Sequence, residues 1–295
     1  MNNLNLFLEV VPAVLTVVGI TGNSLNLYIL SRPEFLKESI FRYFILNEII
    51  CSINLVLLWA HYTPVILEIE VSNIYCKFVP FIIRVFYYYY PWINVVNSVD
   101  RLLLLIYPQR LQFRNKFKFQ ALIVGLILCV IIIFSNVTSI VYGTRNFSND
   151  TLLCIINDRL IGIYISGTNF MLSNLVASCI IILVTCKIAH YLFRKKKLIQ
   201  QNRRIYKREI EFVKNIFTMD FWFIISYTPF TIVLLMQNIL DPSVFITNTW
   251  KILSNTFILL AVVHISCNFF VFLLCNKRFR KYFKSMFSKN HVTPL

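Results

Sequence analysis

Charged residues are scarce in this sequence. Asp, Glu, Lys and Arg together make up 14% of its 295 residues, whereas a soluble domain has about 25%. Hydrophobic residues make up 58%, and the mean hydropathy is +0.68. Because so few polar groups cannot cover a surface that faces water, we expect lipid to surround most of the chain.

The residue patterns of enzymes and metalloproteins are missing as well. The four histidines are scattered, and no set of His and Cys has the spacing of a metal site. The apolar segments contain no convincing pair of acids and no nucleophile with a nearby base. We therefore expect a protein that is not an enzyme, with no catalytic residues, no cofactor and no metal.

Long apolar segments are what the sequence does have. Each reaches the roughly 20 residues that a helix needs to cross a bilayer. They lie at about 6–30, 42–66, 77–105, 119–142, 161–190, 211–239 and 250–275. The first lacks the basic start and the cleavage site of a signal peptide. We predict an all-α membrane protein, with a seven-transmembrane helix bundle over residues 1–276.

The basic residues indicate how the bundle is oriented. The net charge of +16 could suggest a nucleic-acid partner, but 24 of the 29 Lys and Arg lie in or beside alternate gaps, or after the last segment. Basic loops of membrane proteins stay in the cytoplasm. We therefore expect no nucleic-acid partner, and a multi-pass plasma-membrane protein with its N-terminus outside and its C-terminus inside.

Two glycosylation motifs agree with this orientation. Asn146-Phe-Ser and Asn149-Asp-Thr both lie in the fourth gap, which the charge pattern places outside. The sequence therefore predicts glycans on Asn146 and Asn149.

Two of the eight cysteines also fall at the expected outer face. Cys76 directly precedes the third apolar segment and Cys154 precedes the fifth. A disulfide persists in that oxidising compartment, so we predict a Cys76–Cys154 bridge. The other six cysteines lie in apolar segments or at their inner ends, where cysteine is typically a small buried hydrophobe.

The segment after the last apolar run has a different character. In Lys277–Phe287, aromatic residues recur at helical spacing with basic residues between them. This pattern predicts an amphipathic helix that lies in the membrane interface and contacts lipid. With the short cytoplasmic tail that follows, it forms a second unit over residues 277–295.

Several short motifs occur at fixed distances from one another. They are Gly22-Asn23, Cys76, Asp100-Arg101 with Pro108, FIISYTP (Phe223–Pro229) and NFFVF (Asn268–Phe272). With this spacing the chain resembles a rhodopsin-like (class A) G-protein-coupled receptor along essentially its whole length. Ser52 stands where the family usually has an aspartate, and the helix-seven motif lacks its proline and tyrosine. The resemblance is therefore to a divergent branch, such as an invertebrate orphan, peptide or chemosensory receptor.

The resemblance implies a switch at the inner ends of helices three and six. Glu209 lies 20 residues before Pro229, where the family often carries the acid that pairs with the arginine of helix three. We expect an Arg101–Glu209 pair to hold both helices until helix six swings about Pro229 and admits a heterotrimeric G-protein. The alternative is that Asp100 and Arg101 only reach the lipid headgroups. The implied switch residues are Asp100, Arg101, Glu209, Tyr227, Pro229 and Asn268.

The ligand is expected to be an extracellular peptide or small molecule that enters the bundle or rests on its outer loops. The candidate pocket residues are Arg84, Tyr87, Tyr88, Tyr227 and Gln237. Arg84 has an alternative role as a structural partner of Glu68 or Glu70. The aromatic stretch Phe86–Trp92 has the alternative role of packing alone.

Two further acids lie inside apolar segments. Glu48 and Asp220 suit either a polar network that rearranges on activation or hydrogen bonds that only join helices. The sequence leaves both roles open, and it leaves dimerisation unknown. For the whole chain, the alternative to a receptor is a seven-helix ligand-gated channel or transporter without G-protein coupling.

Overall fold

The computed structural model describes residues 3–66, 72–107, 117–147, 151–156, 159–199, 203–239 and 248–287. In chain order its elements are α1 (Asn3–Leu30), α2 (Pro33–Leu36), α3 (Ser39–Ile66), α4 (Asn73–Ile106), α5 (Phe117–Val141), β1 (Tyr142–Phe147), β2 (Thr151–Ile156), α6 (Arg159–Asn169), the π-helix η2 (Phe170–Leu175), α7 (Val176–Ile199), α8 (Arg203–Ile239), α10 (Asn248–Ser266), α11 (Asn268–Cys275) and α12 (Lys277–Phe287).

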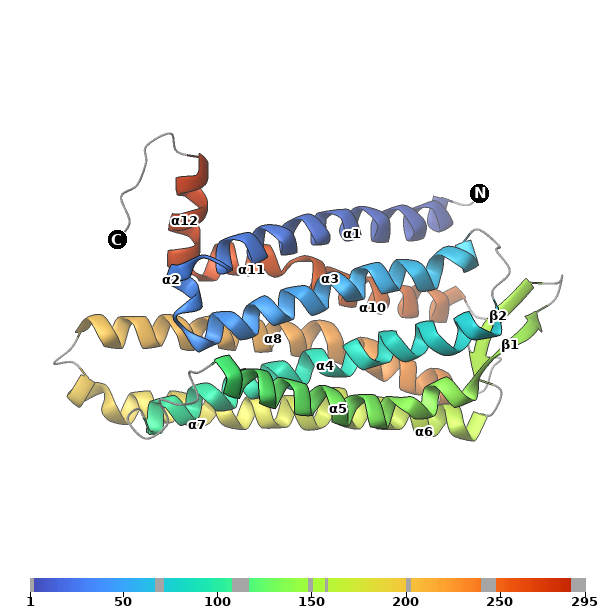
Figure 1. The fold of residues 1–295 in the computed structure, drawn as a ribbon. Coiled ribbons are helices and arrows are strands. Elements are labelled where there is room, and N and C mark those ends of the chain that lie inside the picture. Colours follow the sequence, from blue (N-terminus) through green and yellow to red (C-terminus); the bar gives the residue numbers. More distant parts are fainter. Residues whose placement is uncertain are drawn as a thin grey trace.

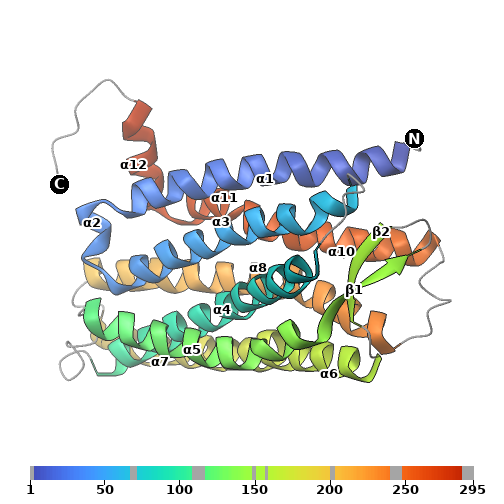
Figure 2. The ribbon, with the colours of Figure 1, turned by 45° about the vertical axis from the view of Figure 1, so that its right-hand side comes forward.

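The described helices lie side by side and build the bundle (Figure 1). Helices one to seven are α1, α3, α4, α5, the composite α6–η2–α7, α8, and the composite α10–α11. The N-terminus and the strands lie at one end of the bundle, while α2 and α12 lie at the other (Figure 2). The described helices thus confirm the predicted fold class, an all-α seven-helix bundle with a short amphipathic helix after it.

Part of the bundle is apolar enough to cross a membrane by length and composition alone. Among the described residues these stretches are Val10–Leu30, Ile40–Ala60, Phe117–Ser135 and Leu160–Arg194, and the bent pair α10–α11 would make a fifth. α4 falls outside this set because prolines, tyrosines and polar residues interrupt it. Much of α4 is buried against other helices rather than facing lipid, so it tolerates these polar side chains.

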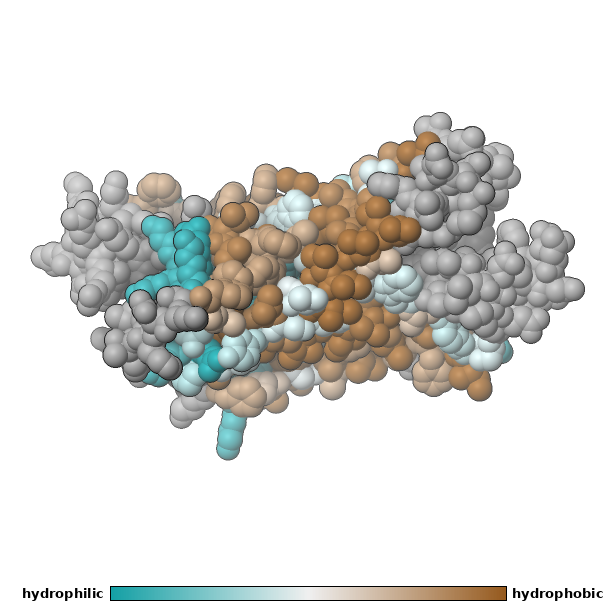
Figure 3. Space-filling model, turned by 90° about the horizontal axis from the view of Figure 1, so that it is seen from above, coloured by the Kyte–Doolittle hydropathy of each residue, from teal (hydrophilic) through white to brown (hydrophobic). Residues whose placement is uncertain are grey.

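The surface of the bundle is apolar and its interior is partly polar. Figure 3 shows a hydrophobic band across the middle of the visible face, with hydrophilic residues gathered toward the end where α12 lies. Ile133 and Leu183 are 70% and 63% exposed, whereas Asn23, Glu48 and Asn268 are completely buried. This distribution is typical of a bundle whose outer face meets lipid.

A β-hairpin lies between helices four and five. β1 and β2 pair antiparallel, with Thr144 opposite Cys154, and α4 contacts both strands. The sequence analysis expected only a connecting loop in this gap. Strands of six residues are too short to register in a search for membrane-length apolar segments.

Helix seven is broken at Cys267. The axes of its two parts differ by 54°, although no proline lies at the break. The Cys267 N–H donates to the Val263 carbonyl at 2.9 Å, and the Val271 N–H donates to the Cys267 carbonyl at 3.1 Å. Asn268 therefore begins α11 directly after the bend.

Candidate functional site

The ends of several helices meet where α2 and α12 lie (Figure 1). α4 and α7 end there and α5 and α8 begin there. We call this end of the bundle the basic end, because α12 alone adds five Lys and Arg to it. It is the end that carries Asp100 and Arg101.

Arg42 ties three helices together at the basic end. Its Nε donates to Oε1 of Gln120 at 2.6 Å, and its Nη1 donates to the Leu36 carbonyl at 2.7 Å. Asp100, which is only 2% exposed, lies close enough for its carboxylate to attract the Arg42 guanidinium. The sequence analysis counted Arg42 only toward membrane orientation, since a base at a helix end carries no signal of its partners.

The expected contact between Arg101 and Glu209 falls partly outside the described structure. Arg101 is half-buried in α4. Glu209 lies within α8, but its side chain is outside the described part of the chain. The Arg101–Glu209 pair therefore stays a prediction.

A polar contact further inside the bundle joins helix three to helix six. The Ser98 hydroxyl donates to Oδ2 of Asp220 at 3.5 Å. Both side chains are buried, with 1% and 5% exposure. Sequence reasoning singled out Asp220 but missed Ser98, because a serine in an apolar segment gives no indication of what it faces.

Other buried amides connect helices two, three and seven. The Asn47 amide donates to Oδ1 of Asn94, and Nδ2 of Asn268 donates to Sγ of Cys51 at 3.3 Å. Glu48 is completely buried beside Asn47. Asn268, predicted as a switch residue, thus joins the bend in helix seven to helix two.

Tyr227 lies at the centre of an aromatic cluster in the middle of the bundle. Its ring stacks on Tyr87 with centroids 4.9 Å apart, and it lies 5.1 Å from Phe223 and 5.8 Å from His264. His264 Nε2 is 3.0 Å from the Tyr90 hydroxyl oxygen. Two predicted pocket residues, Tyr87 and Tyr227, are therefore in direct contact, and the cluster joins helices three, six and seven.

The other predicted pocket residues lie at the edge of this cluster, where the Tyr88 ring is 6.2 Å from the Tyr87 ring, or outside the described side chains. Tyr88 is buried and lies near Arg84 of its own helix and near Tyr164 and Thr168 of α6. Its ring therefore faces helix five. The side chain of Gln237 is outside the described part of the structure.

A lateral cavity of about 610 Å³ opens between α8 and α10. Its walls are apolar apart from Thr228, and it opens to the lipid-facing surface beside Ile225 and Met236. Of the predicted pocket residues whose side chains the structure describes, none lines it. Pro229 borders it together with Leu253 and Phe257 of α10.

The opposite end of the bundle carries the predicted disulfide and glycans. Cys76 is completely buried in α4 and is disulfide-bonded. Cys154 lies in β2, but its side chain is outside the described structure, and so are the Asn146 side chain and the whole of Asn149. The Cys76–Cys154 pairing and both glycosylation sites stay predictions.

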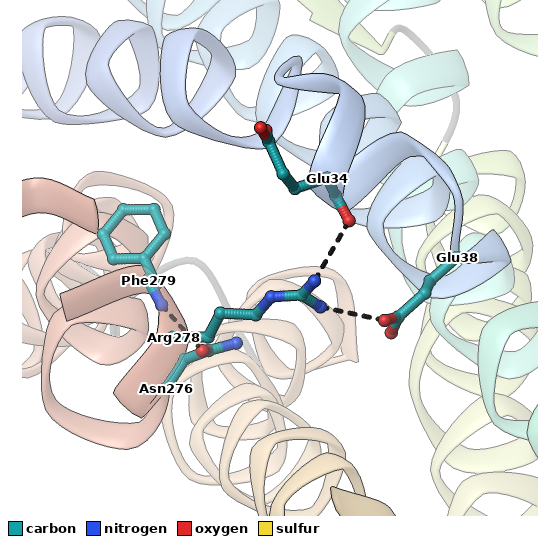
Figure 4. Close-up of polar contacts among 5 residues, drawn as sticks. All are labelled: Glu34, Glu38, Asn276, Arg278 and Phe279. Carbon is teal, nitrogen blue, oxygen red and sulfur yellow. Dashed lines mark hydrogen bonds and ion pairs between the residues drawn. The ribbon is translucent and has the colours of Figure 1, made fainter. Parts of the chain in front are cut away.

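α12 is anchored to the connection between helices one and two (Figure 4). Arg278 Nη1 donates to Oε1 of Glu38 at 2.9 Å, and Nη2 donates to the Glu34 carbonyl at 3.3 Å. Asn276 caps α12, since its Oδ1 accepts from the Phe279 N–H at 2.9 Å. The Phe279 ring is completely buried and packs 5.6 Å from the Phe272 ring. The sequence analysis expected the helix but not this attachment.

These features define a seven-transmembrane receptor: a helix bundle with a polar interior, a broken helix seven and an amphipathic helix after it. Residues 22–272 match the family model for the 7 transmembrane receptor (rhodopsin family). Because the match covers most of the chain, the chain belongs to the rhodopsin family of G-protein-coupled receptors. The resemblance seen in its motifs is thereby confirmed. A search of curated proteins finds no match to the chain.

Membership settles the broad class of the molecule. Receptors of this family are multi-pass plasma-membrane proteins that bind extracellular ligands and couple to heterotrimeric G-proteins. The chain is accordingly a signalling receptor of the plasma membrane. The match does not favour the alternative of a channel or transporter.

Proposed function

We propose that this receptor binds an extracellular peptide or chemosensory small molecule and activates a heterotrimeric G-protein through an outward movement of helix six. The N-terminus lies outside and the basic end lies in the cytoplasm, as the distribution of Lys and Arg favours. The ligand binds the open form of the receptor more tightly and so shifts the population toward it.

The Ser98–Asp220 contact is the observation that carries this proposal. It joins helix three to helix six at 3.5 Å, nine residues before Pro229 in the same helix. Proline removes a backbone hydrogen bond and permits a kink. Movement of the inner part of α8 about Pro229 separates Ser98 from Asp220 and opens a cleft for a helix of the G-protein.

Arg42 supplies the fixed frame for this movement. It connects α3 to α5 through Gln120 and to α2 through Leu36, and its charge attracts Asp100 in α4. In the proposed resting state Arg101 and Glu209 pair across the remaining gap between helices three and six. Through its attraction to Arg42, Asp100 holds the inner end of helix three in place. Arg101 becomes available to the G-protein when helix six moves outward.

The proposed ligand site lies next to Tyr227, on the side toward the end of the bundle that carries the β-hairpin. Tyr87 and Tyr227 stack between helices three and six, so a ligand that moves one ring moves helix six. Arg84, about one turn from Tyr88, offers a charged partner to a carboxylate, and Gln237 is a further proposed contact of the ligand. A Cys76–Cys154 bridge would hold the hairpin at the mouth of this site, with glycans on Asn146 and Asn149.

Basal signalling tests the proposed function without a known ligand. Wild type, Glu209→Ala and Glu209→Ala/Arg101→Ala are expressed at matched surface levels, and G-protein activation is recorded with a panel of sensors. We expect Glu209→Ala to raise basal activation, because it releases helix six, and the added Arg101→Ala to abolish it. If all three stay at the untransfected baseline across the panel, the proposal fails.

A further inference from the structure

We propose that Asn174 is a positioning residue that clasps the proline segment of helix six to helix five and so acts as the fulcrum of the helix-six movement. This inference rests on the proposed function for its role in signalling. The clasp itself is a structural claim, which stands or fails separately.

The clasp is a buried group of hydrogen bonds on both sides of Pro229. Nδ2 of Asn174 donates to Oγ1 of Thr231, and Oγ1 of Thr228 donates to Oδ1 of Asn174 at 3.0 Å. Oγ of Ser178 lies 3.5 Å from the same Oδ1. Asn174 and Thr231 are each 1% exposed, so neither water nor lipid competes for these groups.

The donors and acceptors of this group match one another. The Thr231 hydroxyl accepts from Asn174 and directs its own hydrogen to the Thr228 carbonyl at 2.9 Å. Asn174 is thereby connected to the side chain of Thr228 and, through Thr231, to its backbone. Thr228 directly precedes Pro229, where the helix is weakest because proline offers no N–H.

The local backbone of helix five brings Asn174 to this position. Asn174 lies in the π-helix η2, Phe170–Leu175, which interrupts the α-helical rod between α6 and α7. A π-turn inserts an extra residue and rotates the side chains around it, and such turns occur frequently at functional sites. η2 packs against α8, so this irregular turn faces the proline segment of helix six.

The proline segment also borders a cavity on the side that faces α10. Thr228 and Pro229 both border the lateral cavity of about 610 Å³ between α8 and α10. The hydrogen bonds of Asn174 hold this segment to helix five beside the cavity. When the inner part of α8 swings away from Ser98, the clasp keeps the outer part of α8 against helix five. The movement therefore opens a cleft between helices three and six at the basic end.

The clasp is tested by the distance between helices five and six at their outer ends. Spin labels on encoded non-natural amino acids replace Tyr164 and Ile239, which are 64% and 45% exposed, and the whole purified receptor is measured in lipid nanodiscs. We expect a narrow distance distribution that Asn174→Leu broadens, because leucine fills the space but forms no hydrogen bond. Ser226→Ala is the matched control, since it removes a buried hydroxyl that donates only within α8, to the Trp222 carbonyl at 2.5 Å.

A second readout separates a fulcrum from a merely structural residue. In the Glu209→Ala background, Asn174→Leu is expected to remove more than half of the gain in basal signalling per surface receptor, and Thr231→Val is expected to do the same. The exchange Asn174→Thr/Thr231→Asn is expected to restore the gain in basal signalling. In this variant helix six carries the amide and helix five carries the hydroxyl, so the hydrogen bond between the helices can form again.

Each outcome decides between the claims. An unchanged outer distance in Asn174→Leu overturns the clasp, whatever the signalling shows. A broadened outer distance with the full Glu209→Ala gain retained overturns the fulcrum role. If wild type and Glu209→Ala are both silent, the proposed function fails, and the fulcrum role fails with it, while the outer distance still decides whether the clasp exists.

Discussion

Individual polar side chains inside the bundle hold its helices in one arrangement. A hydrogen bond between membrane helices contributes on average about 0.6 kcal/mol, with a maximum of about 1.7 kcal/mol. That average shifts the ratio of two conformations by about threefold. The Ser98–Asp220 contact therefore has the strength of a bias toward the closed form rather than a permanent bond.

Replacement of Ser98 measures this bias. We expect Ser98→Ala to raise basal G-protein activation by roughly threefold, because the closed form loses its contact with Asp220. Ser52→Ala is the control, since the Ser52 hydroxyl donates to the Glu48 carbonyl of its own helix at 2.8 Å. Equal basal activity in Ser98→Ala and wild type, at matched surface expression, would show that the contact does not restrain helix six.

Gly19 is a residue whose small size the packing requires. A Cβ at this position would lie 2.7 Å from both Leu55 Cδ1 and Ser266 Oγ and 2.9 Å from Ser266 Cα. We expect Gly19→Ala to destabilise the purified receptor by about 1–3 kcal/mol through overpacking, measured as a lower thermal-unfolding midpoint. Gly125→Ala is the control, because its Cβ would meet nothing within 4 Å. Equal midpoints for both variants would contradict the close approach of helices one, two and seven.

At the scale of elements, α12 is held by one buried ring more than by its charges. Phe279 packs 6.0 Å from Phe269 and 5.6 Å from Phe272, whereas the ion pair of Arg278 with Glu38 has a 49% exposed arginine. Exposed ion pairs contribute little. The attachment of α12 to the bundle therefore depends chiefly on the aromatic contact.

Truncation of that ring tests the attachment. We expect Phe279→Ala to cost about 3–5 kcal/mol of local packing and to speed hydrogen exchange across the α12 amides. Phe287→Ala is the matched control, since Phe287 is 75% exposed at the other end of the same helix. Unchanged exchange rates in Phe279→Ala would show that other contacts position α12.

The irregular elements are the part of the fold that the sequence did not reveal. The bend at Cys267 occurs without a proline, and η2 lies with the α-helices around it in one apolar stretch, Leu160–Arg194. Apolar length identifies a membrane helix but not its winding, because both helix types satisfy the backbone internally. These irregular turns place Asn174 and Asn268, which explains why sequence reasoning reached one of them only through a motif and missed the other.

At the scale of the whole molecule, the sequence was sufficient for the fold class and the family. Seven apolar segments and the spacing of short motifs predicted a rhodopsin-family bundle, and the match over residues 22–272 confirms it. Contacts between segments were harder to predict, since they depend on how helices rotate against one another. The sequence analysis therefore named Asp220 and Asp100 but neither Ser98 nor Arg42, the residues that face them.

The central claim is that helix six moves away from helix three at the basic end when a G-protein binds. Its most direct test is the distance between labels at Tyr107, at the end of α4, and Phe217 in α8, which are 48% and 54% exposed, in purified receptor with and without nucleotide-free G-protein. We predict a second, longer distance when G-protein is present, and more of it in Ser98→Ala than in wild type. A single unchanged distance under all four conditions, with G-protein shown to be bound, would contradict the account.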